Sequence, residues 1–196
     1  MQRTADVERN TLETQISLKI NVDGSGVAEI STPIGFLNHM LTLWAKHGCF
    51  DLELNAKGDT EIDAHHTVED IGICLGKALK KALGDKKGIV RFSHMILPMD
   101  EALVLVAVDF SGRGYLAFDA QFKSQKVGEF DTELVEEFFR ALAVNGEITI
   151  HVKMLSGKNT HHIIEAMFKA LGRAMRYAVA KDEKLIGIPS TKGVLV

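Results

Sequence analysis

A pair of adjacent histidines followed by a glutamate occurs twice in this chain of 196 residues. The first copy reads His65-His66-Thr67-Val68-Glu69-Asp70, and the second, His161-His162-Ile163-Ile164-Glu165-Ala166, begins 96 residues later. The likeness continues at the same offset, where Leu75-Gly76-Lys77-Ala78 corresponds to Leu171-Gly172-Arg173-Ala174. We therefore predict two similar halves that arose by internal duplication.

The spacing inside each copy is typical of a metal-binding helix. Glu69 follows His65 by four residues and His66 by three, so on a helix it lies on the same side as both imidazoles. Adjacent histidines point about 100° apart and are better placed to bind two ions than to chelate one. Imidazole and carboxylate ligands suit zinc, manganese, iron or nickel, and the absence of thiolate argues against a soft metal. Surface histidines at a helix start are the alternative, which the duplication of the whole pattern disfavours.

Composition excludes several other classes of protein. The content of 46% apolar and 25% charged residues is ordinary for a globular domain, and the formal charge of −3 gives no reason to expect nucleic acid or a membrane surface as a partner. Cys49 and Cys74 are too few for a disulfide framework and indicate a reducing compartment. The N-terminus lacks the apolar run of a signal peptide, and the run 102–108 is too short to span a bilayer. We expect a soluble, cytoplasmic protein.

Hydrophobic patterning predicts a similar order of elements in both halves, and hence an α/β (α+β) fold. The first half is expected to hold a strand at 12–22, a turn at 23–26, a return strand at 27–31, a helix at 36–47 stopped by Gly48, a strand at 50–55 and a helix from His65 to about Gly84. The second is expected to hold an extra strand at 90–97, strands at 101–108, 115–122 and 148–152, and helices at 132–143 and about 161–180, the last capped by Asn159 or Thr160.

No flexible linker separates the two halves, which we place at 1–88 and 89–196 of one compact unit. The tail at 187–193 has no counterpart in the first half. We expect this tail to be ordered by a ligand or not at all.

Other polar residues are candidates for the same chemistry. His39 would by itself be a buried structural histidine, but beside two paired-histidine motifs it becomes a candidate ligand. Its counterpart in the second half is Glu137, and His151 is a reserve ligand. Glu13, matched by Glu101, opens a strand and is either a solvated residue at the strand edge or a functional carboxylate.

Four cations and a hydroxyl in the second half are candidates for holding a phosphate. Arg113 lies between two glycines, which allow a ligand to approach the backbone closely, and the arginine fork suits phosphate oxygens. Any one of these residues alone would be interpreted as an ordinary surface residue. No phosphate-loop signature is present, so nucleotide binding is not indicated. The candidates are Arg91, Arg113, Lys169, Ser190 and Lys192.

These residues together closely resemble the imidazoleglycerol-phosphate dehydratase family of histidine biosynthesis. The likeness covers nearly the whole chain, and paired histidine motifs in these surroundings are highly specific. The matching stretches are Arg3-Thr4, 11–14, 35–40, 65–70, 98–102, 109–113 and 157–162.

The resemblance implies that the enzyme removes water from imidazoleglycerol phosphate, a phosphorylated imidazole, to give imidazole acetol phosphate. It implies two Mn²⁺ ions per site, shared between subunits, and a homo-oligomer built from trimers, typically of 24 subunits. It also implies that each half places a mainly antiparallel sheet against two helices. Carried over by motif, the metal ligands would be His39, His65, His66, Glu69, His161, His162 and Glu165.

The resemblance also implies roles for other residues. Many family members have a further histidine where this chain has Glu137, so either Glu137 coordinates through oxygen or that ion is less fully ligated here. The five phosphate candidates would hold the substrate phosphate. The ions would act as Lewis acids that orient and acidify the substrate imidazole, while Glu13 and Glu165 transfer protons. Two rival functions are a dinuclear metallophosphatase, which would release inorganic phosphate, and a metal-storage or metal-assembled structural protein.

Overall fold

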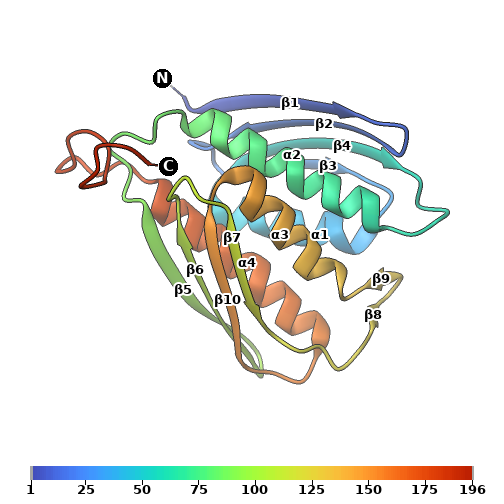
Figure 1. The fold of residues 1–196 in the computed structure, drawn as a ribbon. Helices are drawn as coiled ribbons and strands as arrows, with labels where there is room; N and C mark the ends of the chain where they lie inside the picture. The colour runs from blue at the N-terminus through green and yellow to red at the C-terminus, as the bar shows by residue number, and fades with distance from the viewer. Residues whose placement is uncertain (1, 196) are drawn as a thin grey trace.

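The computed structural model describes residues 2–195, in which two four-stranded sheets enclose a layer of four helices (Figure 1). The first sheet contains β1 (Thr4–Asn10), β2 (Thr14–Asn21), β3 (Ala28–Ser31) and β4 (Asp51–Gly58). The second contains β5 (Phe92–Met99), β6 (Ala102–Asp109), β7 (Tyr115–Asp119) and β10 (Thr149–Ser156). The helices are α1 (Gly35–Gly48), α2 (His65–Leu83), α3 (Leu134–Gly146) and α4 (Thr160–Val179).

The helices of one half pack against the helices of the other. Helix α2 packs against α3, and α1 packs against α4. On their other sides α2 contacts β1 and β2, whereas α4 contacts β5 and β6. Since every helix is covered on two sides, the largest side chains of the core, including Trp44, Phe138 and Phe168, are buried in this middle layer. Each half therefore contributes a sheet and two helices to one shared core.

The two sheets have equivalent strand orders, β1-β2-β4-β3 and β5-β6-β10-β7. In each sheet, the first strand in this order pairs antiparallel with the second, and the second pairs antiparallel with the third. The fourth strand runs parallel to the third. The predicted α/β fold of two similar, mainly antiparallel halves is confirmed. The boundary at residue 88 stays a prediction.

The predicted return strand at 27–31 forms, but it does not pair with the strand before it. Strand β4 lies between β2 and β3, and β3 runs parallel to β4 with Ala28 opposite Leu52. Period-two alternation indicates that a segment is extended but carries no information about which strand it pairs with.

Three strands were not expected from the sequence. Strand β1 buries only Ala5 fully among its seven side chains, so its sequence shows little hydrophobic alternation. Strands β8 (Lys126–Val127) and β9 (Phe130–Asp131) form a small sheet of their own between β7 and α3 in the chain.

Glycines in the repeated Leu-Gly-x-Ala segments allow the helices to cross closely. A β-carbon at Gly76 of α2 would lie 2.6 Å from the backbone nitrogen of Gly146 in α3. A β-carbon at Gly172 of α4 would lie 2.5 Å from the carbonyl oxygen of Trp44 in α1. The two equivalent glycines therefore serve equivalent helix crossings, which explains why this part of the duplication is retained alongside the histidines.

The predicted role of Gly48 as the residue that stops α1 is wrong. The left-handed residue at the end of α1 is Cys49, with φ of 54°, and Glu147 takes the same conformation after α3, with φ of 52°. Gly48 instead makes room for its neighbours, because a β-carbon there would lie 2.5 Å from the ring of Phe50.

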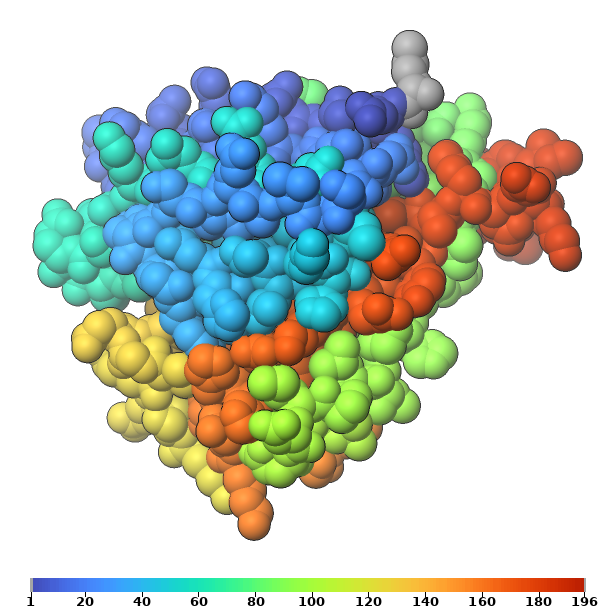
Figure 2. Space-filling view, turned by 180° about the vertical axis from the view of Figure 1, so that it is seen from behind, coloured from blue at the N-terminus to red at the C-terminus, as the bar shows by residue number. Residues whose placement is uncertain are grey.

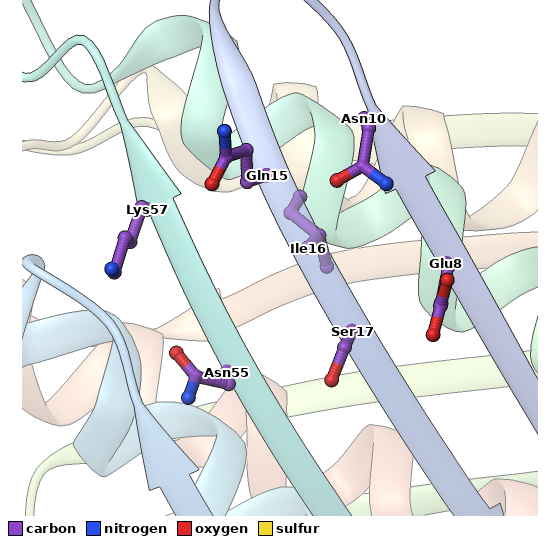
Figure 3. A pocket seen from close by; sticks show the side chains of 7 residues that line it. All are labelled: Glu8, Asn10, Gln15, Ile16, Ser17, Asn55 and Lys57. Atoms are coloured by element: carbon purple, nitrogen blue, oxygen red, sulfur yellow. The ribbon is translucent and has the colours of Figure 1, made fainter.

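The outer faces of the two sheets differ in chemistry. The face of the first sheet is polar, and Figure 3 shows its side chains around a hollow of about 290 Å³. The corresponding face of the second sheet is mostly apolar. Its apolar residues, placed by the strand register, are Phe92, Ile96, Pro98, Leu103, Leu105, Ala107, Tyr115 and Ala117. Two sheets of the same topology therefore present different surfaces.

The tail after α4 is held by hydrogen bonds within the chain. The backbone N–H of Gly88 donates to the carbonyl oxygen of Gly187 over 2.8 Å, and Nη1 of Arg91 donates to the carbonyl oxygen of Pro189 over 2.7 Å. Figure 2 shows the tail, in red, at one side of the molecule. The tail therefore has hydrogen bonds to the rest of the chain, which the expectation of a tail ordered only by a ligand did not include.

Within residues 2–195, no helix combines the length and the apolar character that crossing a membrane requires.

Asp51 attaches the turn at 23–26 to the start of β4. Its Oδ1 accepts hydrogen bonds from the backbone N–H groups of Ser25, Gly26 and Val27, over 2.8 to 3.1 Å. The bond from Ser25 is the largest influence on the pKa of Asp51, and together these bonds lower it below the ordinary 3.8 against a smaller opposing effect of burial.

Replacing Asp51 with alanine is expected to lower the free energy of unfolding by about 1.5–3 kcal/mol at pH 7, the loss typical of a hydrogen bond to a charged group. Because the pKa is lower in the folded state, this stabilisation is complete above the unfolded pKa of about 3.9 and is lost as the pH falls through the folded value. Denaturant titrations at pH 7 and pH 3 measure the free energy of unfolding of both proteins. The difference between wild type and variant should be smaller at pH 3. A difference that stays the same at both pH values would contradict this role.

Candidate metal centre and phosphate pocket

His39 on α1 and His161 and Glu165 on α4 form one cluster. The Nε2 atom of His39 lies 3.3 Å from Oε2 of Glu165, and Nε2 of His161 lies 3.2 Å from the same oxygen. One ligand atom from each of the three residues lies within 4.8 Å of the other two. Because α1 packs against α4, this cluster joins a residue of the first half to two residues of the second.

The cluster fits a divalent transition-metal ion. Such ions hold nitrogen and oxygen ligands at about 2.0–2.2 Å, so neighbouring ligand atoms lie about 3 Å apart, close to the separations found here. Two imidazoles and a carboxylate suit manganese, iron or zinc. Among residues 2–195 no other group of three histidine, cysteine or acidic side chains meets the same distance criterion.

Glu165 is the most enclosed member of the cluster, with 9% of its side chain exposed. Its Oε1 accepts a hydrogen bond of 2.5 Å from Nζ of Lys169, one helical turn further along α4. Burial acts to raise the pKa of Glu165, but Lys169, assisted by His161 and His39, outweighs burial and holds the pKa below its ordinary value. The carboxylate is therefore ionised and able to act as a ligand or as a base.

Within residues 2–195, the first paired-histidine motif forms no equivalent three-residue cluster. Nε2 of His65 lies 4.0 Å from Oε2 of Glu69, and the rings of His65 and His66 are almost perpendicular. Glu137 lies half-buried on α3 and belongs to no three-residue ligand group within residues 2–195. His151 lies on the exposed outer side of β10 beside Tyr115, not in the cluster.

The second histidine of each motif is bonded to a carboxylate outside the motif. Nδ1 of His66 lies 3.0 Å from Oδ2 of Asp59 and 3.8 Å from Oε2 of Glu13. Nδ1 of His162 lies 2.8 Å from Oε2 of Glu101. No sequence pattern singles out Asp59, whereas the correspondence between Glu13 and Glu101 could have indicated Glu101.

Glu101 also binds the start of α4. Its carboxylate accepts bonds from His162 and from the backbone N–H groups of Asn159 and Lys158, and these lower the pKa of Glu101 to about 2. Asn159 in turn caps the helix, since its Oδ1 accepts from the backbone N–H groups of His161 and His162. Asn159 is thus one of the two caps predicted from the sequence, and the cap fixes the backbone that carries the histidine pair.

Four of the five phosphate candidates line a pocket of about 410 Å³ beneath the tail. They are Arg91, Arg113, Ser190 and Lys192. The fifth, Lys169, lies instead in the histidine cluster, bonded to Glu165. The structure therefore separates the five residues that were grouped from the sequence.

Arg91 connects this pocket to the body of the protein. Its Nε and Nη2 donate to the carboxylate of Asp109 over 2.8 and 3.2 Å, and its Nη1 donates to Pro189. Its backbone has φ of 79°, a conformation that non-glycine residues adopt at a cost and that often occurs at functional sites. Three bonds thus hold Arg91 under the tail, where it supports Pro189.

The pocket and the cluster lie at opposite ends of α4. His161 is in the first turn of α4, whereas the backbone N–H of Arg91 donates to the carbonyl oxygen of Ala178 in the last turn. Seventeen residues separate His161 from Ala178, which corresponds to about 25 Å at the α-helical rise per residue.

A larger hollow of about 810 Å³ is lined by residues of the segments 33–36, 60–64 and 126–131. One wall contains Phe36, whose ring meets the edge of the His161 ring at 5.2 Å. Another contains Asp63 and Ala64, and Oδ1 of Asp63 accepts a bond of 2.7 Å from the backbone N–H of His65. The hollow therefore lies beside residues that contact His161 and His65, although neither histidine lines it.

The family model described as imidazoleglycerol-phosphate dehydratase matches residues 32–175, which span His39, both histidine pairs and Glu165. The chain belongs to this family. Curated relatives with the same name include those of Desulforamulus reducens, 62% identical over 195 residues, and Acetivibrio thermocellus, 63% identical over 195 residues. Both alignments cover 100% of each chain.

Solved structures of family members have the same fold. The crystal structure from Staphylococcus aureus subsp. aureus N315 is 46% identical with a TM-score of 0.83, covering 91% of this chain and 99% of that one. The structure from Pyrococcus furiosus is 44% identical with a TM-score of 0.84, covering 96% of this chain and 100% of that one. The predicted family is confirmed, and the chain is a dehydratase of histidine biosynthesis.

Proposed function

We propose that this chain dehydrates imidazoleglycerol phosphate to imidazole acetol phosphate with the help of two Mn²⁺ ions per site. The observation that carries the metal part of this proposal is the cluster of His39, His161 and Glu165, whose ligand atoms lie within reach of one ion. That cluster falls inside the region matched by the family model.

The remaining motif residues would complete the two sites. We assign His65, His66, Glu69 and His162 as further ligands, with Glu137 taking the place of a further histidine. When bound, the ions would supply Lewis acidity to the substrate imidazole and lower the pKa of its N–H group. The division of ligands between the two ions stays open.

The chain's own residues supply proton transfer and orientation. Glu165, kept ionised by Lys169, and Glu13, with 55% of its side chain exposed beside His66, are the proposed proton-transfer groups. Arg113, Ser190 and Lys192 would hold the phosphate, and this grip would fix the position of the reacting carbons. Lys169, which bonds to Glu165 within the chain, stays a predicted phosphate ligand.

One chain cannot present the cluster and the phosphate pocket to the same substrate molecule. They are about 25 Å apart along α4, whereas an imidazole, three carbons and a phosphate extend roughly 10 Å at about 1.5 Å per bond. We therefore propose a homo-oligomer in which the pocket of one copy serves the metal centre of another. The mostly apolar outer face of the second sheet is suited to such contact, since burying it between copies removes apolar surface from water. The count of 24 subunits built from trimers stays a prediction, which the mass in solution tests.

Mixing two defective variants tests this sharing. His161→Ala removes a metal ligand and Lys192→Gln weakens the phosphate pocket, so each alone should be nearly inactive at low substrate concentration. After dissociation and reassembly of an equal mixture, about one quarter of shared sites would combine an intact centre with an intact pocket from two different copies. Activity of the mixture that never exceeds the mean of the separate variants would contradict sharing.

Product analysis tests the reaction itself. Purified protein supplied with Mn²⁺ and imidazoleglycerol phosphate should form imidazole acetol phosphate with the phosphate retained. Release of inorganic phosphate would instead favour the rival dinuclear metallophosphatase. Loss of the oligomer on chelation, without turnover of the substrate in the presence of metal, would favour a metal-assembled structural protein.

The proposal places the enzyme in the cytoplasm. Cys49 and Cys74 are both free thiols, as expected in a reducing compartment.

A further inference from the structure

The second histidine of each pair has a carboxylate partner that the motif does not contain. Asp59 lies 3.0 Å from Nδ1 of His66, and Glu101 lies 2.8 Å from Nδ1 of His162. Asp59 follows β4, whereas Glu101 precedes β6, so the two carboxylates come from different positions in their halves. The two histidines therefore have the same kind of partner at Nδ1, although the two carboxylates come from different positions in their halves.

We propose that Asp59 and Glu101 are positioning residues that hold His66 and His162 ready to bind metal through Nε2. A carboxylate accepts a hydrogen bond from Nδ1–H, and this leaves the lone pair of a neutral imidazole on Nε2. Metal-binding histidines commonly use their other ring nitrogen in this way, which fixes the ring and strengthens the ligand. The inference rests on the proposed metal function.

Glu101 is held in place by the backbone. Its Oε1 accepts from the N–H groups of Lys158 and Asn159 over 3.1 and 2.7 Å, while Oε2 faces His162. The carboxylate is therefore attached to the loop that starts α4 and to the histidine that α4 carries. Rotation of the His162 ring would break the bond to an oxygen that cannot easily follow it.

Asp59 is held by the turn between β1 and β2. Its backbone N–H donates to the carbonyl oxygen of Glu13 over 3.1 Å, and its side chain is only 15% exposed. Its Oδ1 is buried and has no hydrogen-bond partner among residues 2–195. His66 is thus the side-chain partner on which this largely buried carboxylate depends.

Comparison of the two halves assigns different tasks to Glu13 and Glu101. They occupy corresponding positions, but Asp59 is closer to His66 than Glu13 is, at 3.0 Å against 3.8 Å. In the second half Glu101 is itself the nearer carboxylate, at 2.8 Å from Nδ1 of His162 against 3.8 Å for Asp100, so Glu101 orients His162. Because Asp59 orients His66, Glu13 stays exposed and available for proton transfer.

Equilibrium dialysis of Mn²⁺ against the full-length oligomer tests this inference. Asp59→Asn and Glu101→Gln keep side-chain shape but lose the charge, and each should weaken Mn²⁺ binding by about 10–100-fold, as loss of such partners typically does. Asp59→Ala should weaken binding more than Asp59→Asn, because asparagine keeps an acceptor oxygen. Glu13→Gln should lower turnover while leaving the Mn²⁺ dissociation constant within about twofold.

The control is Glu53→Gln on the outer face of the first sheet. This variant should change neither turnover nor the Mn²⁺ dissociation constant. Thermal unfolding of the metal-free proteins shows whether each variant folds, and if one isosteric variant does not, the other carries the test. Mn²⁺ binding of Asp59→Asn and Glu101→Gln equal to that of wild type would overturn the inference while leaving the metal centre intact. Wild-type protein that binds no Mn²⁺ would overturn the proposed metal function itself.

Discussion

Replacing Glu165 with glutamine is expected to lower kcat by about 10²–10⁴-fold, the range for loss of a proton-transfer group. Glu165 is the buried carboxylate shared by His39 and His161, and Lys169 keeps it ionised. Glutamine has the same shape but cannot carry a proton away or hold an ion with a negative charge. Steady-state kinetics at saturating Mn²⁺ should show the loss in kcat, with a change in KM of only a few fold because the phosphate pocket lies elsewhere.

Two controls separate this effect from general damage. Glu53→Gln, an exposed pair partner of Lys19 on the first sheet, should leave kcat unchanged. Retained binding of a phosphate-bearing substrate by Glu165→Gln would show that the pocket still forms. Unaltered turnover in Glu165→Gln at saturating metal would remove this residue from the mechanism.

Replacing Lys192 with glutamine is expected to raise KM by about 10–100-fold, which corresponds to a hydrogen bond to a charged group worth about 1.5–3 kcal/mol. Lys192 lines the pocket with Arg113 and Ser190, and its backbone N–H donates to Oγ of Ser190. Loss of the ammonium removes attraction for the phosphate but leaves the metal centre untouched. KM should therefore change much more than kcat.

Lys184 provides the matched control for this variant. It lies on the same tail, outside the phosphate pocket, and its backbone N–H donates to Asp182. Lys184→Gln should leave KM within about twofold of wild type. A similar rise in KM for both variants would indicate a general effect of tail charge and would contradict a specific pocket.

The sequence was sufficient to predict the layout of the fold because duplication repeats its strongest signals. The helices at 35–48, 65–83, 134–146 and 160–179 were all predicted to within a few residues. Strand β1 was missed because only Ala5 of its side chains is fully buried, so alternation is weak there. The neighbour of β3 was not predictable from local pattern, since strand pairing depends on contacts between distant segments.

The site was less predictable than the fold. Spacing within each motif is a local property, so the pairing of His161 with Glu165 follows from helical geometry. The approach of His39 to Glu165 depends on the packing of α1 against α4, so the sequence could mark His39 only as a candidate ligand. Asp59 has no repeat partner, and nothing in the pattern around it marks it as a partner of His66.

Lys169 has a contact in the structure that its residue type alone did not indicate. From the sequence it was one of several cations suited to phosphate, but its place one turn after Glu165 puts its ammonium on that carboxylate. The i,i+4 spacing was visible in the sequence and favours such an ion pair on a helix. Its predicted contact with phosphate stays a prediction, because within one chain the pocket lies at the other end of α4 and only the pocket of another copy could reach Lys169.

Titration of metal-free protein with Mn²⁺, with bound ions and dehydratase activity followed together, tests the central claim most directly. We predict that two ions bind per chain and that activity on imidazoleglycerol phosphate appears as these sites fill. Full turnover in protein stripped of metal, or full activity with a single ion per chain, would contradict a two-ion centre built from the paired histidines.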